Sequence, residues 1–172
     1  MRTVLIFALL ASPAFAQDSA GTTAALSACG PAKVKFEVTP DQTPQLSKPP
    51  DGKALVYVVE DRGDAACLVG CETIRVGLDG SWTGANQGNT HFSFTVLPGE
   101  HHLCANWQSS LKRYSSLHAL ANFTAEAGKV YYFRTRVLSS KAFDYLDLDT
   151  LNSDEGRYLV AASPAVVSHP KK

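Results

Sequence analysis

The feature that most constrains this fold is a succession of short runs in which apolar and polar residues alternate, with turn-forming dipeptides between them. Between residues 53 and 162 the runs recur about every eight to twelve residues. Alternation with a period of two is typical of a strand that buries one face. Asp79-Gly80 is the strongest of the turns, because this pair readily adopts the positive φ angles of a two-residue hairpin. The pattern predicts an all-β fold rather than alternating strands and helices.

The alternating runs predict one strand near the start of the chain and eight in the domain that follows. We expect strands at about 33–38, 54–59, 74–78, 81–84, 92–96, 100–107, 117–123 and 129–138, and one around Leu146 and Leu148. Residues 54–59 are apolar on both faces, which indicates a central strand covered on both sides. Eight strands joined by short turns predict an antiparallel β-sandwich of the Ig-like or transthyretin-like kind.

One short C-terminal helix is expected after the last of these strands. Ser153 is its predicted N-cap, and Asp154 and Glu155 would lie at the positive end of the helix dipole. Gly156 weakens this prediction, because glycine is a poor helix former.

Residues 1–16 have the three parts of a secretory signal peptide. Arg2 is the positive residue, residues 4–11 form the apolar segment, and Ala14-Phe15-Ala16 is the small-x-small cleavage site. We therefore expect an exported protein, periplasmic or secreted. Its 156 remaining residues have the length of one domain.

The composition divides the rest of the chain into three parts. Residues 17–52 are expected to be a disordered leader that contains the strand at about 33–38 and ends in a proline-rich connector. Residues 53–162 are the predicted β-sandwich domain. Residues 163–172 contain two prolines and end in two lysines, which predicts a flexible tail.

The four cysteines are Cys29, Cys67, Cys71 and Cys104. An even number in an exported chain favours disulfides, and three pairings are open. We favour Cys29–Cys104 together with Cys67–Cys71, because the second pair closes a very short loop in which Gly70 can form the turn. The alternative is a zinc site made of both pairs and a histidine. A Cys-x3-Cys spacing without a second strong pair is weak support for it, so no metal and no cofactor are expected.

Leu26-Ser27-Ala28-Cys29 has the form of a lipobox, in which the cysteine is acylated and anchors the protein to a membrane. A lipobox directly follows the apolar segment, whereas here a polar run that includes Asp18 separates the two. Cleavage after Ala16 is therefore favoured, and a membrane-tethered lipoprotein anchored at Cys29 is the alternative. Cys29 cannot be both a lipid anchor and the disulfide partner of Cys104.

The charges are balanced, with 16 Lys and Arg against 16 Asp and Glu. Loss of Arg2 with the signal peptide leaves a net charge of −1. No basic field is present that would hold nucleic acid or an anionic membrane. No second apolar run approaches the roughly 20 residues of a membrane helix, so no transmembrane segment is expected in the mature protein.

Three residues on one face of the strand at 129–138 are candidates for ligand binding: Tyr132, Arg134 and Arg136. Such a stripe could bind an anion, a glycan or a partner protein. It could equally be a solvated face, with Asp144 or Glu126 as counter-charges.

Trp82 lies just after the Asp79-Gly80 turn, where an indole is often exposed. It could be a binding anchor or could fold back over the sheet.

Two histidines are the candidates for an enzymatic or metal-binding alternative. His102 shares a strand face with Glu100, whereas the adjacent His101 points to the opposite face. His102 or His118 could act as a base if it lay in a concave pocket beside a carboxylate or a serine. The sequence contains neither a Gly-x-Ser-x-Gly elbow nor a phosphate-binding loop before a helix, so no residue is predicted to be catalytic.

A set of strand and turn segments resembles a known family. In order, they are Ala54-Leu55-Val56-Tyr57-Val58, Val76-Gly77-Leu78-Asp79-Gly80, Leu97-Pro98-Gly99-Glu100-His101, Ala127-Gly128-Lys129-Val130-Tyr131-Tyr132-Phe133-Arg134 and Asp154-Glu155-Gly156. They are similar to the bacterial family called domain of unknown function 2846, which occurs in exported proteins and lipoproteins. The resemblance covers about residues 53 to 162 and implies a small β-sandwich with a Pro-Gly hairpin. It implies no catalytic residues, and the cysteines and the proline-rich leader fall outside the family pattern.

Together these observations predict a non-catalytic binding or scaffolding module of the bacterial cell envelope, with a protein or glycan partner that the residues do not specify. This hypothesis requires Trp82, Tyr132, Arg134 and Arg136 to form one exposed patch. The alternative is a small periplasmic enzyme or metal-binding protein that uses His102 or His118.

Overall fold

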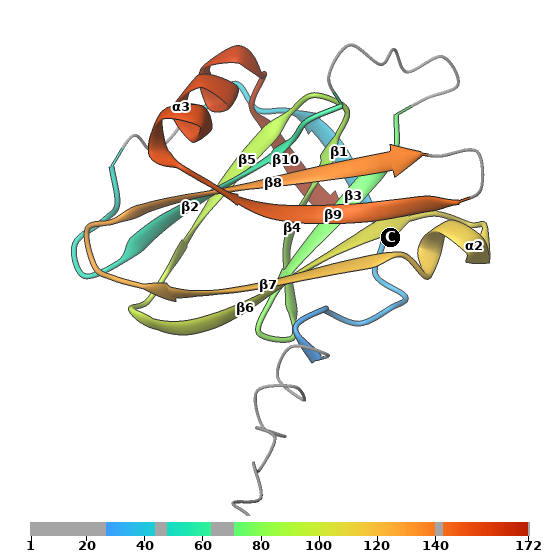
Figure 1. Ribbon diagram of the computed structural model, residues 1–172, viewed down its shortest axis with the longest axis horizontal. Coiled ribbons are helices and arrows are strands. Elements are labelled where there is room, and N and C mark those ends of the chain that lie inside the picture. Colours follow the sequence, from blue (N-terminus) through green and yellow to red (C-terminus); the bar gives the residue numbers. More distant parts are fainter. Residues whose placement is uncertain (1–26, 44–47, 63–70, 140–142, 172) are drawn as a thin grey trace, which may run out of the picture.

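The computed structural model describes residues 27–43, 48–62, 71–139 and 143–171. Within these ranges the chain forms ten strands and two helices (Figure 1). The strands are β1 (Phe36–Pro40), β2 (Ala54–Glu60), β3 (Thr73–Leu78), β4 (Ser81–Gln87), β5 (His91–Val96), β6 (Gly99–Gln108), β7 (His118–Ala125), β8 (Val130–Ser139), β9 (Asp144–Leu151) and β10 (Val166–Pro170). The helices are α2 (Lys112–Ser115) and α3 (Ser153–Ala162).

The strands form an all-β sandwich of two four-stranded sheets and an additional two-stranded sheet. One large sheet has the order β5-β2-β8-β9 and the other β4-β3-β6-β7. Helix α3 lies over the outer face of the first, which we call the helix-side sheet (Figure 1). A segment of the chain before β1 lies over the outer face of the second, which we call the strap-side sheet. The fold class agrees with the sequence prediction, although one pair, β2 with β8, is parallel rather than antiparallel.

The core lies between the two large sheets. It is built from the alternate side chains that each strand directs inward, such as Val56 and Val58 on β2, Ile74 and Val76 on β3, and Phe133 on β8. Each of these side chains is fully buried. The period of two in the sequence therefore reports the inner face of each sheet, as expected for strands with one apolar face.

Strand β2 is buried on both faces because α3 covers the helix-side sheet from outside. Leu55 and Tyr57 of β2 and Tyr132 of β8 form a second apolar cluster beneath the helix, and the rings of Tyr57 and Tyr132 stack with centroids 5.5 Å apart. Gly156 allows the helix to lie this close, since a Cβ at this position would be 2.2 Å from Cγ of Tyr132. The glycine that argued against the helix is therefore a requirement of its packing.

The N-cap of α3 differs from the prediction. Asn152, rather than Ser153, precedes the helix, and its side-chain oxygen accepts hydrogen bonds from the backbone N–H groups of Asp154 and Glu155 at 3.0 Å. Both residue types are good N-caps, so composition alone could not separate them. The two acidic residues lie in the first turn as expected.

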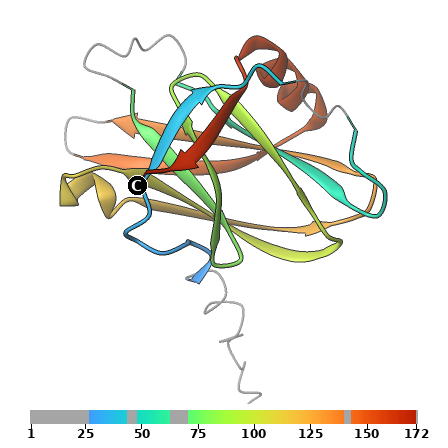
Figure 2. The ribbon, with the colours of Figure 1, turned by 180° about the vertical axis from the view of Figure 1, so that it is seen from behind.

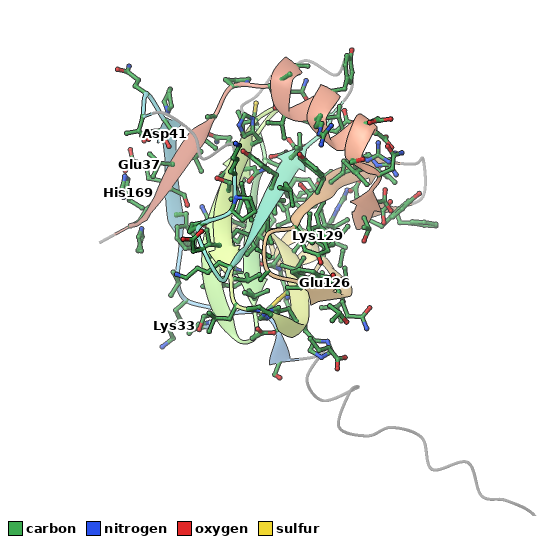
Figure 3. All side chains as sticks on the ribbon, turned by 90° about the vertical axis from the view of Figure 1, so that its left-hand side faces the viewer. Lys33, Glu37, Asp41, Glu126, Lys129 and His169 are labelled. Carbon is green, nitrogen blue, oxygen red and sulfur yellow. A yellow bond between two sulfur atoms is a disulfide. The ribbon has the colours of Figure 1, made fainter. Side chains whose placement is uncertain are left out.

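The C-terminal segment predicted to be a flexible tail forms β10 over residues 166–170. It pairs antiparallel with β1, with Phe36 opposite Pro170 and Pro40 opposite Val166. Figure 2 shows this pair crossing in front of the rest of the molecule. In Figure 3, Glu37 and His169, which are neighbours in the pair, point outward from it. The tail prediction is wrong for β10 because its backbone hydrogen bonds come from a strand more than a hundred residues away in sequence.

Residues 27–35, which we call the strap, cross the outer face of the strap-side sheet before β1. Cys29 is paired in a disulfide with Cys104 of β6, as predicted, with the two Cα atoms 5.0 Å apart. Gly77 of β3 allows the close approach, because a Cβ there would be 2.8 Å from the carbonyl oxygen of Ala28. The backbone N–H of Gly80, in the predicted Asp79-Gly80 turn, donates to the same oxygen. The part of the chain expected to be a disordered leader is therefore ordered along the strap.

The second predicted disulfide, Cys67–Cys71, involves Cys67, which lies outside the described residues. In the described part of the chain, neither helix has the length and apolar character needed to cross a membrane.

Candidate functional site

The four residues expected to form one binding patch lie on different sheets. Tyr132, Arg134 and Arg136 are on the outer face of the helix-side sheet, and Trp82 is on the strap-side sheet. Tyr132 is only 8% exposed because it lies under α3. The structure therefore does not bring these four side chains together, so the predicted patch is wrong and a binding role has to rest on another site.

Arg134 and Arg136 are part of an ion-pair network. Arg134 contacts Glu155 at 2.8 Å, Asp149 at 3.3 Å and Asp61 at 3.7 Å. Their positive charges are thus compensated within the protein. The counter-charges differ from the expected Asp144 and Glu126, since Asp144 pairs with Arg113 of α2.

Arg136, two residues after Arg134 on the same face of β8, belongs to the same network. It contacts Asp149 at 2.6 Å and Asp147 at 3.2 Å. Burial alone would lower the pKa of Arg136, but the two aspartates outweigh it and raise the pKa above the ordinary value. The stripe that looked like an anion-binding surface is a self-contained network of acids and bases.

Trp82 lies at a cavity on the strap-side sheet. Its indole Nε1–H donates to the carbonyl of Pro31 in the strap at 2.9 Å. Gly30 makes room for the ring, since a Cβ there would be 2.5 Å from its Cδ1. The strap and the indole together form one wall of the cavity.

The cavity, which we call the strap pocket, has a volume of about 280 Å³. Its walls come from the strap, from β3 and β4, from the end of β6 and the residue after it, from α2 and from the start of β7. The residues that matter most to its chemistry are Lys35, Arg75, Trp82, Ser109 and His118. None of the described residues that line it is an aspartate or a glutamate.

Arg75 is the dominant feature of the strap pocket. It is only 6% exposed, and its guanidinium carbon lies 4.4 Å from the centre of the Trp82 ring. Its Nε and Nη2 groups donate to Oδ1 of Asn106, and its Nη1 group donates to the strap carbonyls of Ala32 and Val34. All of these acceptors are neutral. In the described part of the chain, no carboxylate lies within 4.0 Å of this guanidinium.

The environment of Arg75 lowers its pKa, and burial is the cause. A charged group taken out of water without a counter-charge is costly, which is the effect that this direction reports. Contact with the indole face offsets part of the cost. Arg75 therefore brings an uncompensated positive charge to the pocket.

The side chain of Asn106 lies between Arg75 and His118 and contacts both. With Oδ1 facing Arg75, the two N–H groups of Nδ2 are shared among three acceptors, which are the carbonyls of Ser115 and Leu117 and, at 3.1 Å, Nε2 of His118. Because Nδ2 is a donor, Nε2 of His118 is the acceptor, and its Nδ1–H donates to the carbonyl of Ser116 at 2.9 Å. Both ring nitrogens of His118 therefore have a hydrogen-bond partner.

The other histidine candidate lies away from the strap pocket. Nε2 of His102 is 3.8 Å from a carboxylate oxygen of Glu100, so these two residues share a face as predicted. Its neighbour His101 contacts Asp79 at 2.6 Å and the carbonyl of Leu97 at 2.8 Å. The described residues contain no group of three or more His, Cys, Asp or Glu side chains arranged to hold a metal ion.

A second cavity, of about 330 Å³, lies between the end of β2 and the C-terminal half of α3. Glu60 lines it but is only 1% exposed, and neither of its carboxylate oxygens has a hydrogen-bond partner. Burial, and then the charge of Glu72, raise the pKa of Glu60 well above its ordinary value, more than Arg62 and the Gly88 N–H lower it. The Gly88 N–H is close enough to act on the carboxylate but lies outside hydrogen-bonding geometry. Because the carboxylate oxygens are inaccessible, this cavity offers a ligand less than the strap pocket does.

Trp82 and His118 were singled out from the sequence for two different hypotheses, and the structure places both at one cavity. Arg75 and Lys35 were missed. Arg75 is a polar position in the alternating run 74–78, a pattern that favours a solvated side chain, and the cover provided by the strap is what buries it. Arg75 lies opposite Asn106 in the β3–β6 pair, a pairing that the sequence alone does not show.

Comparisons with known proteins returned no match: no family model, no curated protein and no solved structure is similar to this chain.

Proposed function

We propose that this protein is an exported, non-catalytic binding module of the cell envelope, and that the strap pocket is its ligand site. The observation that carries the proposal is Arg75, a buried charge without a counter-charge at a cavity that also contains an indole. Binding sites typically combine an apolar or aromatic wall with a few placed polar groups. The strap pocket has both, in a volume suited to a ligand of roughly monosaccharide size.

The pocket is held in shape before any ligand arrives. The strap is fixed by the Cys29–Cys104 disulfide and by the hydrogen bonds that Arg75 makes to Ala32 and Val34. A preorganised site loses less entropy on binding than a flexible one. The fastened strap therefore supports a binding role in addition to its contribution to stability.

Export agrees with these features. The first sixteen residues have the form of a signal peptide, and a disulfide persists in an oxidising compartment. The sulfur of Cys29 is committed to Cys104, which favours cleavage after Ala16 over a lipid anchor at Cys29. We infer a periplasmic or secreted protein.

A binding role is favoured over catalysis by the state of His118. Both of its ring nitrogens already have hydrogen-bond partners. No aspartate or glutamate is among the described residues that line the pocket, so none can orient His118 or share a proton with it there. The envelope ligand would be bound and released unchanged.

Ligand-observed NMR with a mixed panel of sugars, amino acids, organic acids and phosphates tests the proposal. Ser109→Trp fills the pocket, whereas Ser110→Trp adds the same side chain at an exposed neighbouring position that does not line it. We expect at least one panel member to bind the wild type and Ser110→Trp but not Ser109→Trp. Binding that persists in a folded Ser109→Trp, or an absence of binding across the panel, would contradict the assignment of this pocket.

A further inference from the structure

The charge and the free hydrogen-bond donors of the strap pocket point to one ligand chemistry. We propose that the strap pocket binds a small oxyanion, a carboxylate or a phosphate, through Arg75, Lys35 and Ser109. This inference rests on the proposed function, because it names the ligand class of the same site.

The strap pocket has an unbalanced positive charge. Arg75 is buried and Lys35 is exposed at the rim, and the described lining residues include no acid to neutralise either. A ligand that carries a negative charge supplies the missing partner. A buried charge interacts strongly with such a partner, because water screens it less than it screens a charge on the surface.

The strap pocket also has hydrogen-bond donors without acceptors. A guanidinium has five N–H groups, and the contacts of Arg75 to Asn106, Ala32 and Val34 use four, which leaves one N–H on Nη2. The ammonium of Lys35 has no partner among the described residues. The hydroxyl of Ser109 accepts from the N–H of Leu111 at 3.1 Å, so its proton is free to be donated.

The acceptors that lie around Arg75 are already used. Oδ1 of Asn106 and the strap carbonyls of Ala32 and Val34 accept from Arg75. The side-chain oxygen of Gln108 accepts from the N–H of Phe36. A surplus of donors over acceptors matches the oxygens of a carboxylate or phosphate, which only accept when ionised.

The contacts of Arg75 also hold its guanidinium in place when no ligand is bound. The guanidinium is held between strap and sheet, and the Trp82 ring lies against it at 4.4 Å. It therefore cannot turn away to reach solvent or a distant carboxylate. Lys35, by contrast, is exposed and can close over the bound anion.

The test is an NMR titration that follows the indole N–H of Trp82, which is fixed by its bond to Pro31. Sodium glucuronate, sodium phosphate and neutral glucose are compared at constant ionic strength made up with sodium chloride. We expect a saturable shift with glucuronate, phosphate or both, and none with glucose. A response to glucuronate alone identifies a carboxylate ligand, and a response to phosphate alone identifies a phosphorylated one.

Lys35→Gln tests the residues, with Lys33→Gln as its matched control. Both lysines are exposed on the strap, but Lys33 does not line the pocket and points away from the domain in Figure 3. We expect Lys35→Gln to weaken anion binding roughly tenfold and Lys33→Gln to leave it nearly unchanged. Ser109→Ala should weaken it by a smaller factor.

Three results would overturn the oxyanion inference: glucose binding as tightly as glucuronate, equal losses in Lys35→Gln and Lys33→Gln, or no saturable shift with either anion. In the first case the proposed function survives, because a ligand still occupies the strap pocket. In the third, the panel with Ser109→Trp decides separately whether the pocket binds anything.

Discussion

The outer faces of the two sheets carry buried or half-buried arginines under a cover, yet they balance charge in opposite ways. On the helix-side sheet, two arginines contact four carboxylates, from Asp61, Asp147, Asp149 and Glu155. On the strap-side sheet, Arg75 contacts only neutral acceptors. Their surroundings shift the pKa of Arg136 upward and that of Arg75 downward.

The comparison shows why a stripe of arginines is a poor guide to a binding site. Arg134 and Arg136 looked like an anion-binding surface but already have their partners within the protein. Arg75 looked like a routine strand residue but lacks one. What distinguishes Arg75, the arginine proposed to bind a ligand, is the absence of a counter-charge among the described residues, which depends on the packing of distant segments.

The largest expected effect comes from detaching the strap. The double variant Cys29→Ala, Cys104→Ala removes a link between residues 75 apart in sequence, which should lower the free energy of unfolding by about 4 kcal/mol. It should also weaken binding at the strap pocket, since Cys29 is part of its wall. Denaturant unfolding and the NMR titration measure the two effects. Unchanged stability and unchanged affinity together would contradict the role given to the strap.

The equivalent change on the other face is Gly156→Ala. A Cβ there would be 2.2 to 2.7 Å from side-chain atoms of Tyr132, so α3 must move away from the sheet. We expect a loss of about 1–3 kcal/mol. Gly-to-Ala changes within helices normally stabilise, so a gain in the midpoint of urea unfolding would show that α3 is not packed this closely. Anion affinity should not change.

Glu60 is a buried ionisable side chain without a hydrogen-bond partner, and its charge state can be tested through stability. An unfolded carboxyl loses its proton near its ordinary pKa, whereas folded Glu60 keeps its proton to higher pH. Its contribution to stability therefore falls as pH rises from the ordinary value towards the raised one. Glu60→Gln should remove this decline and stabilise the protein at pH 8 by on the order of 1 kcal/mol.

The measurement is the unfolding free energy of Glu60→Gln minus that of the wild type at pH 4, 6 and 8. The contributions of the other titrating groups cancel in this difference. Glu37→Gln, at an exposed position of β1, is the control and should show no such trend. A difference that does not grow with pH would show that Glu60 is ionised in the folded protein.

The smallest effect is expected from Arg136→Gln. Arg136 shares Asp149 with Arg134 and is partly exposed, so the loss should be below about 1 kcal/mol and smaller at high salt. Thermal unfolding at low and high ionic strength checks this. A loss of several kcal/mol would mean that Asp149 and Arg134 do not compensate for the missing guanidinium.

Alternation and turn residues predicted most of the sandwich, because they depend on neighbours in the chain. The Asp79-Gly80 hairpin has φ angles of 49° and 89°, and β2 is central because residues 54–59 are apolar on both faces. The direction of pairing was less accessible, since alternation is the same in a strand with parallel or antiparallel neighbours. This is why the parallel β2–β8 pair was missed.

The candidate site was the least predictable part, because it is formed by contacts between segments that are distant in sequence. Whether Arg75 is buried depends on the strap, whose Cys29 reaches Cys104 across 75 residues of sequence. Trp82 and His118 could be singled out by type, but nothing in their spacing shows that they line one pocket. Likewise, the carboxylates that neutralise Arg134 come from three separate elements.

The most direct test of the account is the dissociation constant of the anion bound in the strap pocket, measured for the wild type, Lys35→Gln and Arg136→Gln. The account predicts that Lys35→Gln weakens binding roughly tenfold and that Arg136→Gln leaves it unchanged. A loss confined to Arg136→Gln, or the same loss in both variants, would contradict the claim that the strap pocket, and not the arginine stripe of the helix-side sheet, holds the ligand.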